Sequence, residues 1–319
     1  MSTEMADIKT VATRVAFGAA LVEIGEKRDD FIVLDADLAA ATQTGMFKKA
    51  FPERFYDCGI AEQNMVSIAA GVAATGKKVV CSSFAMFAAG RAFEQVRNSI
   101  GYPHLNVIIG ATHAGISVGE DGATHQCNED IALMRTIPGM TIINPADETE
   151  AKIAMYAAMD HNGPVYLRFG RLATPIIFDE DYDFKIGKGV ELREGSDVTI
   201  IATGLMVNEA LQAREMLQEE GISARVINIA TIKPLDTEII LKAAKETGAI
   251  VTAEEHSIIG GLGSAVAECV AEEYPIPVVK LGVNDTFGHS GPAAKLLDEF
   301  GLRAVNIVEK AKKAIAMKK

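Results

Sequence analysis

One carboxylate, Glu62, stands where the surrounding composition has no need of an acid. It follows Gly59 and opens a helix that the pattern predicts over residues 62–75, in which nearly every residue from 65 to 74 is small or apolar. A helix that is apolar on all faces is a buried one. Glu62 could complement the unpaired N–H groups of the helix start, worth ~0.3–1 kcal/mol when exposed, or it could be a functional acid. The neighbouring segments must decide between these roles.

A second set of reactive side chains lies within residues 112–126, which contain two histidines, two acids and three glycines. Loops tolerate buried polar groups poorly, so a long, polar, glycine-rich loop is often a binding loop. We therefore favour a functional role for this segment. Its candidate groups are His113, Asp121 and His125.

Two shorter segments also carry candidate chemistry. Asp35 and Asp37 follow one predicted strand, and Phe84 and Phe87 follow the next. The two phenyl rings could stack on a flat heterocycle, although core packing is the more usual role, and the acids could be ordinary loop residues. All four segments fall at strand ends or helix starts, where open α/β sheets place their ligands.

Other motifs carry less weight. Gly-Gly-Leu-Gly at 260–263 lacks the third spaced glycine of a dinucleotide loop, so packing at a helix start is the better interpretation. The remaining histidines have no neighbouring cluster, and we expect structural or solvent-facing roles for them: His104, His161, His256 and His289.

The elements that must position these residues alternate between short β-rich runs and longer helical patterns, which is typical of βαβ units. Several strands are apolar without alternation, as expected when both faces are covered. The pattern predicts an α/β fold of two domains, each a mostly parallel sheet with helices on both faces. Predicted strands are 31–35, 78–82, 106–111, 140–144, 165–169, 198–203, 224–229, 249–253 and 278–281, and predicted helices include 11–27, 62–75, 86–100, 148–161 and 206–220.

The domain boundaries follow from one interruption of this alternation. The acidic, glycine-containing stretch from Ile176 to Ser196 has neither period. We place the first domain at residues 1–178, a linker at 179–196 and a second, smaller domain at 197–319.

Composition limits the partners and the location. The 319 residues are 49% hydrophobic and 23% charged, with a net charge of -12, which disfavours nucleic acid and anionic lipid. The N-terminus has no basic and apolar signal pattern, and no apolar run approaches the ~18 residues of a membrane span. We expect a cytoplasmic protein. Its cysteines form no Cys-x-x-Cys pair and are expected to be reduced thiols: Cys58, Cys81, Cys127 and Cys269.

Four stretches together resemble a known family. They are the 59–76 helix, the Phe84-x-x-Phe87 pair, GEDGATHQ at 119–126 and INPAD at 143–147. Over nearly the whole chain the sequence resembles the pyrimidine-binding and C-terminal domains of transketolase. The resemblance implies thiamine diphosphate as cofactor, with Glu62 bonded to a pyrimidine nitrogen. A carboxyl group there favours the imino tautomer, whose exocyclic nitrogen removes the thiazolium C2 proton.

The same resemblance implies roles for the aromatic and loop residues. Phe84 and Phe87 would line the aminopyrimidine pocket. Asp121 and His125 would face the sugar hydroxyls, and His113 would lie nearer the acceptor. Glu62, His113 and His125 are thus the expected catalytic residues.

The resemblance also implies a subsite for the substrate phosphate. Arg14 and Arg168 match phosphate-binding arginines, which suit an anion even on an acidic protein because guanidinium groups bind phosphate bidentately. Asp37 belongs to the same substrate-binding set. Two positions depart from the family: Ala41 replaces a phosphate-binding serine, and Gly90 replaces a pyrimidine-contacting aromatic.

The metal site is expected on another chain. Thiamine diphosphate enzymes hold the diphosphate through Mg²⁺ with a Gly-Asp-Gly segment, which this sequence lacks. The resemblance therefore implies the C-terminal subunit of a split transketolase of the pentose phosphate pathway. Its N-terminal partner would carry the Mg²⁺ and diphosphate site, and two pairs would form a heterotetramer.

Three alternatives remain at this point. ARVINIATIKPLD and GGLGSAVAE in the second domain resemble the β subunit of a 2-oxo acid dehydrogenase, and GIAEQ at 59–63 resembles deoxyxylulose phosphate synthase. A non-catalytic regulatory subunit that kept the fold is the third. His113 and the GEDGATHQ loop favour transketolase, a transferase of ketol groups between sugar phosphates.

Overall fold

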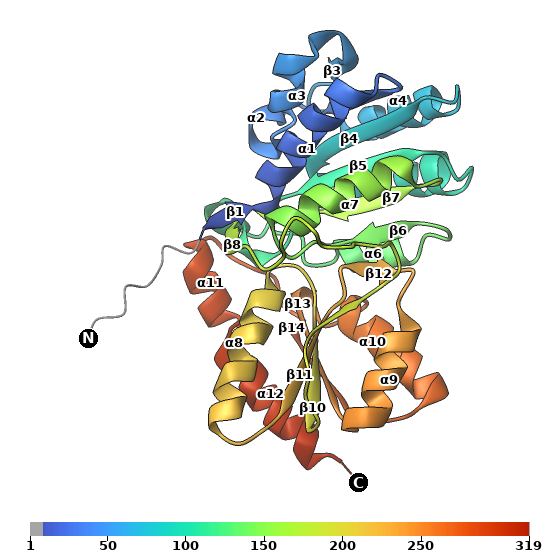
Figure 1. Cartoon of the computed structure of the whole chain (residues 1–319). Coiled ribbons are helices and arrows are strands. Elements are labelled where there is room, and N and C mark those ends of the chain that lie inside the picture. Colours follow the sequence, from blue (N-terminus) through green and yellow to red (C-terminus); the bar gives the residue numbers. More distant parts are fainter. Residues whose placement is uncertain (1–8, 319) are drawn as a thin grey trace.

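Apart from Arg14, the predicted site residues lie at or after the ends of strands in the larger of two main sheets, whose strands are labelled in Figure 1. The computed structural model describes residues 9–318. The seven strands of the larger sheet lie in the order β12-β6-β7-β5-β4-β2-β3 and are parallel except for the antiparallel edge strand β12. They are β2 (Phe31–Asp35), β3 (Phe55–Asp57), β4 (Lys78–Phe84), β5 (Val107–Thr112), β6 (Thr141–Ile143), β7 (Val165–Arg168) and β12 (Thr231–Lys233).

Helices cover both faces of this sheet, which explains why its strands are apolar without alternation. One face packs against α1 (Thr13–Lys27), α3 (Gly45–Ala50) and α7 (Glu148–Asp160) around Phe17, Phe31 and Met155. The other packs against α4 (Glu62–Ala73), α6 (Asp130–Arg135) and the irregular helical segment 86–101, which includes α5 (Phe93–Gln95). The short α2 (Ala39–Thr42) follows β2.

The smaller sheet has five strands in the order β14-β13-β10-β11-β9, again parallel except for one edge strand, β9. Its strands are β9 (Val190–Arg193), β10 (Val198–Ala202), β11 (Ala224–Asn228), β13 (Ile250–Ser257) and β14 (Val278–Val283). One face packs against α8 (Met206–Glu219), α11 (Ala293–Glu299) and α12 (Ala304–Ala316), and the other against α9 (Thr237–Thr247) and α10 (Leu262–Glu273). This arrangement confirms the predicted fold class.

Short strands depart from the predicted elements. The predicted linker 179–196 contains β9, and β12 joins the larger sheet from within the predicted second domain. A further two-stranded sheet pairs β1 (Thr10–Ala12) with β8 (Ala173–Pro175). Strands of three or four residues are too short to show a period. The predicted boundaries stay predictions, and residues 1–8 lie outside the described part of the chain.

The expectation that α4 is buried on all faces is wrong. Its inner face packs on the sheet, while a second face of small and polar residues is open to solvent in the single chain. Small side chains give a weak periodic signal, so composition alone could not separate the two faces. The exposed residues are Gln63, Asn64, Ser67, Ile68 and Gly71.

Two expectations from composition can be compared with the described residues. All four cysteines are free thiols, of which Cys81 and Cys127 are fully buried. No helix within residues 9–318 is both long and apolar enough to cross a membrane.

Candidate active site

Glu62 is a buried carboxylate at the carboxyl end of the larger sheet. It is the first residue of α4, it follows the left-handed turn at Gly59 (φ 68°), and it is only 1% exposed. Ser83 Oγ donates to its Oε1 at 3.3 Å, and Arg91 Nη1 donates to its Oε2 at 2.8 Å. A carboxylate removed from water in this way depends on its partners. Both donors come from other elements, so the fold builds this site around the acid.

Aromatic rings form the wall beside this carboxylate. Phe84 ends β4, and its ring is stacked with that of Phe87 at a centroid distance of 5.9 Å and an interplanar angle of 15°. The His113 imidazole stacks on Phe84 at 3.9 Å. The His125 ring meets Phe87 edge-on at 5.2 Å. The structure therefore brings together four rings that lie on two separate segments of the sequence.

His113 is held in a strained and water-poor position. It has a left-handed backbone (φ 57°), is 3% exposed, and its Nδ1 lies 2.9 Å from Thr112 Oγ1. Burial, together with the positive charges of Arg14 and Arg171, lowers the pKa of His113 to about 3. The imidazole is therefore neutral across the physiological range, and it offers one N–H donor and one acceptor.

The predicted substrate loop stays buried from His113 to Gly119 and becomes exposed at Glu120. Ile116–Asp121 forms a tight helical turn, and left-handed glycines at Gly119 (φ 87°) and Gly122 (φ 75°) reverse the chain. Asp121 is exposed, and His125 is half-buried with Nδ1 2.9 Å from Thr124 Oγ1. Both side chains are thus available to a ligand.

Two arginines form a positive cluster next to His113. Arg14, at the start of α1, donates to the carbonyl oxygen of Ala41 at 2.5 Å. Arg171 donates to Glu120 Oε2 at 2.9 Å and to the carbonyl oxygen of Val118. Burial and the charge of Arg171 lower the pKa of Arg14. Both guanidinium groups also act on His113, so the two arginines bring positive charge to the region of His113, which suits an anion.

Arg168 lies in a different environment from the other two arginines. It ends β7, is 3% exposed, and its Nε donates to Asp130 Oδ2 at 2.8 Å. Burial opposes its charge, but the Asp130 carboxylate prevails and raises the pKa of Arg168. The cavity that it lines has a volume of about 10 Å³, which is room for about one water molecule. This geometry does not support the phosphate-binding role predicted for Arg168.

Asp37 lies in a loop whose conformation is stabilised by hydrogen bonds to the buried Asp35 side chain. Asp35 accepts hydrogen bonds from Leu38 N, Thr42 Oγ1 and Thr44 Oγ1 at 2.6–2.8 Å. Burial raises the pKa of Asp35 to about 6. Asp37 itself is exposed, with φ 62°, and its N–H donates to Asp57. The structure gives Asp37 no contact with the aromatic wall.

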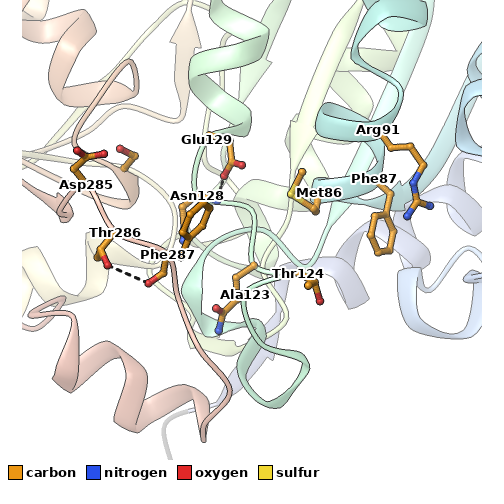
Figure 2. A pocket seen from close by; sticks show the side chains of 12 residues that line it. Met86, Phe87, Arg91, Ala123, Thr124, Asn128, Glu129, Asp285, Thr286 and Phe287 are labelled. Carbon is orange, nitrogen blue, oxygen red and sulfur yellow. Dashed lines mark hydrogen bonds between the residues drawn. The ribbon is translucent and has the colours of Figure 1, made fainter.

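An open cavity of about 710 Å³ adjoins the aromatic wall (Figure 2). Phe87 and Arg91 lie together at one side of it, and the loop with Asp285 and Phe287 lies at the other. Phe287 is 86% exposed. Among the predicted site residues, only Phe87 lines this cavity.

Three residues at the site were not identified from the sequence: Ser83, Arg91 and Arg171. Arg91 could not have been found by spacing, because it lies 29 residues from Glu62 and meets it only in the folded chain. For Arg171, the sequence did contain an indication of a ligand-facing position. Arg168 ends a strand buried on both faces, whereas Arg171 follows that strand and can turn outward.

A metal centre is not formed by the described residues. Within residues 9–318, no three side chains of the types His, Cys, Asp and Glu come together in an arrangement that could hold a metal ion.

Comparison with known proteins identifies the family. Residues 9–176 match the family "Transketolase, pyrimidine binding domain", and residues 187–307 match "Transketolase, C-terminal domain". The chain is 53% identical over 300 residues to a putative transketolase C-terminal section from Methanocaldococcus jannaschii, covering 93% of this chain and 94% of that one. It is 46% identical to a 6-deoxy-6-sulfo-D-fructose transketolase subunit from Clostridium sp., covering 91% and 90%.

A solved structure has the same extent. A chain described as "Split gene transketolase, inactive beta4 tetramer" superposes with a TM-score of 0.89 at 52% identity, covering 98% of this chain and all of that one. The chain therefore belongs to the transketolase family and corresponds to its pyrimidine-binding and C-terminal domains.

Proposed function

We propose that this chain is the C-terminal subunit of a two-chain transketolase, which transfers a two-carbon ketol unit between sugar derivatives. One observation carries the proposal. Glu62 is a fully buried carboxylate that is hydrogen-bonded to Ser83 and Arg91. These two residues flank, in sequence, a stacked pair of phenylalanines. A non-catalytic subunit would not need a carboxylate there, since even a paired buried charge often adds no net stability over apolar packing.

Transketolases use thiamine diphosphate, and the residues present fit one end of it. A flat aminopyrimidine suits the apolar faces of Phe84 and Phe87, with the Glu62 carboxylate as a partner for a ring nitrogen. Bound cofactor supplies the carbon that accepts the two-carbon unit. Glu62 would hold and exchange the proton at the pyrimidine nitrogen, and the ring wall would exclude water from that exchange.

The loop histidines are suited to handling hydroxyl protons. Neutral His113 can donate or accept a hydrogen bond without change of charge. His125 is half-buried beside the aromatic wall and Asp121 is exposed on the same loop, and both would bind sugar hydroxyl groups. We assign them to substrate recognition, with His113 nearer the acceptor.

We reassign the anionic subsite to Arg14 and Arg171 in place of Arg168. Two neighbouring guanidinium groups can bind a phosphate or another terminal anion. Ala41 offers only its carbonyl oxygen there, which accepts from Arg14, and no hydroxyl donor. The relative that acts on a 6-sulfo sugar supports a subsite that depends on charge more than on one hydrogen-bond pattern. We propose sugar phosphates as substrates.

The second chain would supply what the described residues lack. It would bring Mg²⁺ ligands and the diphosphate pocket, because no metal cluster forms within residues 9–318. The exposed face of α4 carries small and polar residues around Ile68, and together with Ile60, which is 78% exposed, it is a surface that another chain could cover. The related tetramer described as inactive supports self-association of this chain and a heterotetramer with the partner.

Reconstitution tests the proposal. The chain is mixed with a transketolase N-terminal section, thiamine diphosphate and Mg²⁺, and ketol transfer from a ketose phosphate to an aldose phosphate is followed. Parallel assays with pyruvate and glyceraldehyde phosphate examine the deoxyxylulose phosphate alternative. Ketol transfer with no pyruvate consumption is expected. Pyruvate consumption alone, or no turnover with any pair, contradicts the proposal.

A further inference from the structure

Two adjacent glutamates at the end of β13 have different partners, although both are buried. Glu254 makes its hydrogen bonds within the C-terminal half of the chain. Its carboxylate accepts from Leu262 N at 2.7 Å and Gly263 N at 2.8 Å, and so it caps the start of α10. This cap is the helix-start role predicted for the 260–263 glycine motif.

Glu255 reaches the loop that carries the predicted substrate residues. Its Oε1 accepts the backbone N–H of Ser117 at 2.6 Å. The chain passes so close that a Cβ atom on Gly115 (φ 82°) would collide with the Glu255 carboxyl group. Ser117 lies in the helical turn that ends at Asp121. One side chain of the smaller sheet therefore fixes the first turn of the loop.

The main chain of the same strand end is also tied to this loop. Arg168 Nη2 donates to the carbonyl oxygens of Glu255 at 3.0 Å and Cys127 at 3.4 Å, while its Nε is held by Asp130. A fourth bond runs from Ser257 N to the carbonyl oxygen of Asn128 at 2.7 Å. Arg168 thus joins the two halves of the chain and holds Glu255 in place.

The far end of the loop has a separate tie to the C-terminal half. Gln126 Nε2 donates to the carbonyl oxygens of Ile116 at 3.1 Å and His289 at 3.0 Å. The segment between the two ties, residues 120–125, is mostly exposed. Its position therefore depends on the anchors at its ends.

We propose that Glu255 is a positioning residue for the transketolase reaction, which sets the substrate loop through Ser117 without touching substrate. This inference rests on the proposed function for its catalytic consequence. Asp121 and His125 must meet a substrate held beside Glu62, and a displacement of about 1 Å in such a site can lower the rate ~10²-fold. The C-terminal half would thus complete the active site by fixing its loop.

Hydrogen–deuterium exchange on the chain tests the positioning directly, with Glu255→Ala, Glu255→Asp and Glu255→Gln compared with wild type. Alanine removes the acceptor, and aspartate keeps the carboxyl group but is one carbon too short to reach Ser117. Both are expected to speed exchange at Ser117 roughly 10-fold or more, since a buried hydrogen bond is lost. Glutamine keeps an acceptor oxygen and should restore slow exchange. Wild-type exchange at Ser117 in both Glu255→Ala and Glu255→Asp overturns the proposal.

Glu254→Gln and Glu254→Ala are the matched controls, because this neighbour is equally buried and also accepts backbone N–H groups. Glu254→Ala should speed exchange at Leu262 and Gly263 and leave Ser117 unchanged. If Glu254→Ala speeds amide exchange at Ser117 as much as Glu255→Ala does, the cause is a general weakening of β13. The specific role of Glu255 is then rejected.

Kinetics of the reconstituted enzyme give the second readout. Glu255→Asp is expected to lower kcat/KM for sugar substrates roughly 10–100-fold, with an unchanged Kd for the cofactor, since Glu62, Phe84 and Phe87 lie outside the loop. A parallel loss of cofactor affinity and melting temperature would contradict positioning. If wild-type enzyme shows no ketol transfer, the proposed function fails, while the exchange result still decides whether Glu255 holds the loop.

Discussion

Arg91 places its guanidinium 2.8 Å from the Glu62 carboxylate and over the ring of Phe87, 4.4 Å from the ring centroid. The same carboxylate must meet a pyrimidine nitrogen when the proposed cofactor binds. Arg91 is 47% exposed along its side chain, whereas Glu62 is 1% exposed. The arginine side chain therefore borders solvent into which it could turn, whereas the glutamate is enclosed. Arg91 would keep the buried acid paired in the single chain until the cofactor takes its place.

The first prediction concerns this acid. Glu62→Gln should fold normally, because the amide keeps the shape: its oxygen can accept from Arg91, and its NH₂ group can donate to Ser83 Oγ. It should abolish turnover, since an amide cannot exchange the proton at the pyrimidine nitrogen. Proton–deuterium exchange at the cofactor C2 in the reconstituted enzyme measures this step. A wild-type C2 exchange rate in the variant would remove Glu62 from the mechanism.

The second prediction separates two arginines that lie three residues apart. Arg171→Gln should lower kcat/KM for phosphorylated substrates ~10–200-fold through loss of charged hydrogen bonds worth ~1.5–3 kcal/mol, with little change in stability. Arg168→Met should instead reduce the free energy of unfolding by ~3–5 kcal/mol, because it leaves Asp130 buried and unpaired.

Urea unfolding and steady-state kinetics on both variants provide the check. An unphosphorylated sugar is the internal control, since its kinetics should be insensitive to Arg171. A phosphate-specific kinetic loss in a stable Arg168→Met protein would restore the original assignment of Arg168.

The two arginines also show where sequence reasoning was sufficient and where it was not. The continuous apolar runs identified the main strands, and an acid before a helix of small residues identified Glu62. The position of Arg171 after the buried strand β7 favours it over Arg168 as the ligand-facing arginine, but the bond that holds Arg168 in the interior is made to Asp130, which is 38 residues away in sequence. Arg91 and Glu255 were missed for the same reason: their partners are distant in sequence and adjacent only in the fold.

The third prediction concerns the exposed loop residues. Asp121→Ala and His125→Ala should each lower kcat/KM for sugar phosphates ~10–200-fold, if each loses hydrogen bonds worth ~1.5–3 kcal/mol. Both side chains are at least partly exposed, so thermal unfolding should be nearly unchanged. A panel of sugars that differ at single hydroxyl groups identifies the group each residue contacts. Unchanged kinetics across the whole panel would exclude these two residues from substrate binding.

The fourth prediction follows from the pKa of His113, which is lowered from 6.5 to about 3 in the folded chain. Between these two pH values the unfolded state binds the proton and the folded state does not, so the free energy of unfolding falls as the pH drops below about 6.5. This single group costs roughly 1.4 kcal/mol per pH unit well inside that window. His113→Asn should therefore lose less stability than wild type between pH 7 and pH 5.

Urea unfolding of both proteins at the two pH values measures the difference. Buried carboxyl groups with raised pKa, such as Asp35 and Glu150, act in the opposite direction but are common to both proteins and cancel. Parallel stability curves would mean that His113 is protonated with equal ease in the folded and unfolded chains.

The last prediction is that this chain alone neither binds thiamine diphosphate tightly nor turns over. Glu62, Phe84 and Phe87 can hold only the pyrimidine end, whereas the diphosphate brings several negative charges to a chain of net charge -12. Without Mg²⁺ ligands those charges are repelled, and no metal cluster forms within the described residues. An interface that completes such a site should be of the obligate type, burying more than ~2,000 Å².

Isothermal titration with cofactor and Mg²⁺ compares the chain alone with the chain plus a transketolase N-terminal section. Only the mixture should show micromolar affinity. Ile68→Asp, on the exposed face of α4, should weaken assembly of the mixture and lower its affinity for the cofactor, since it places a charge in an apolar contact. Gln63→Glu on the same helix is the milder control. Micromolar cofactor binding with ketol transfer by the isolated chain would refute the two-chain site, because this chain would then hold every group that the diphosphate requires.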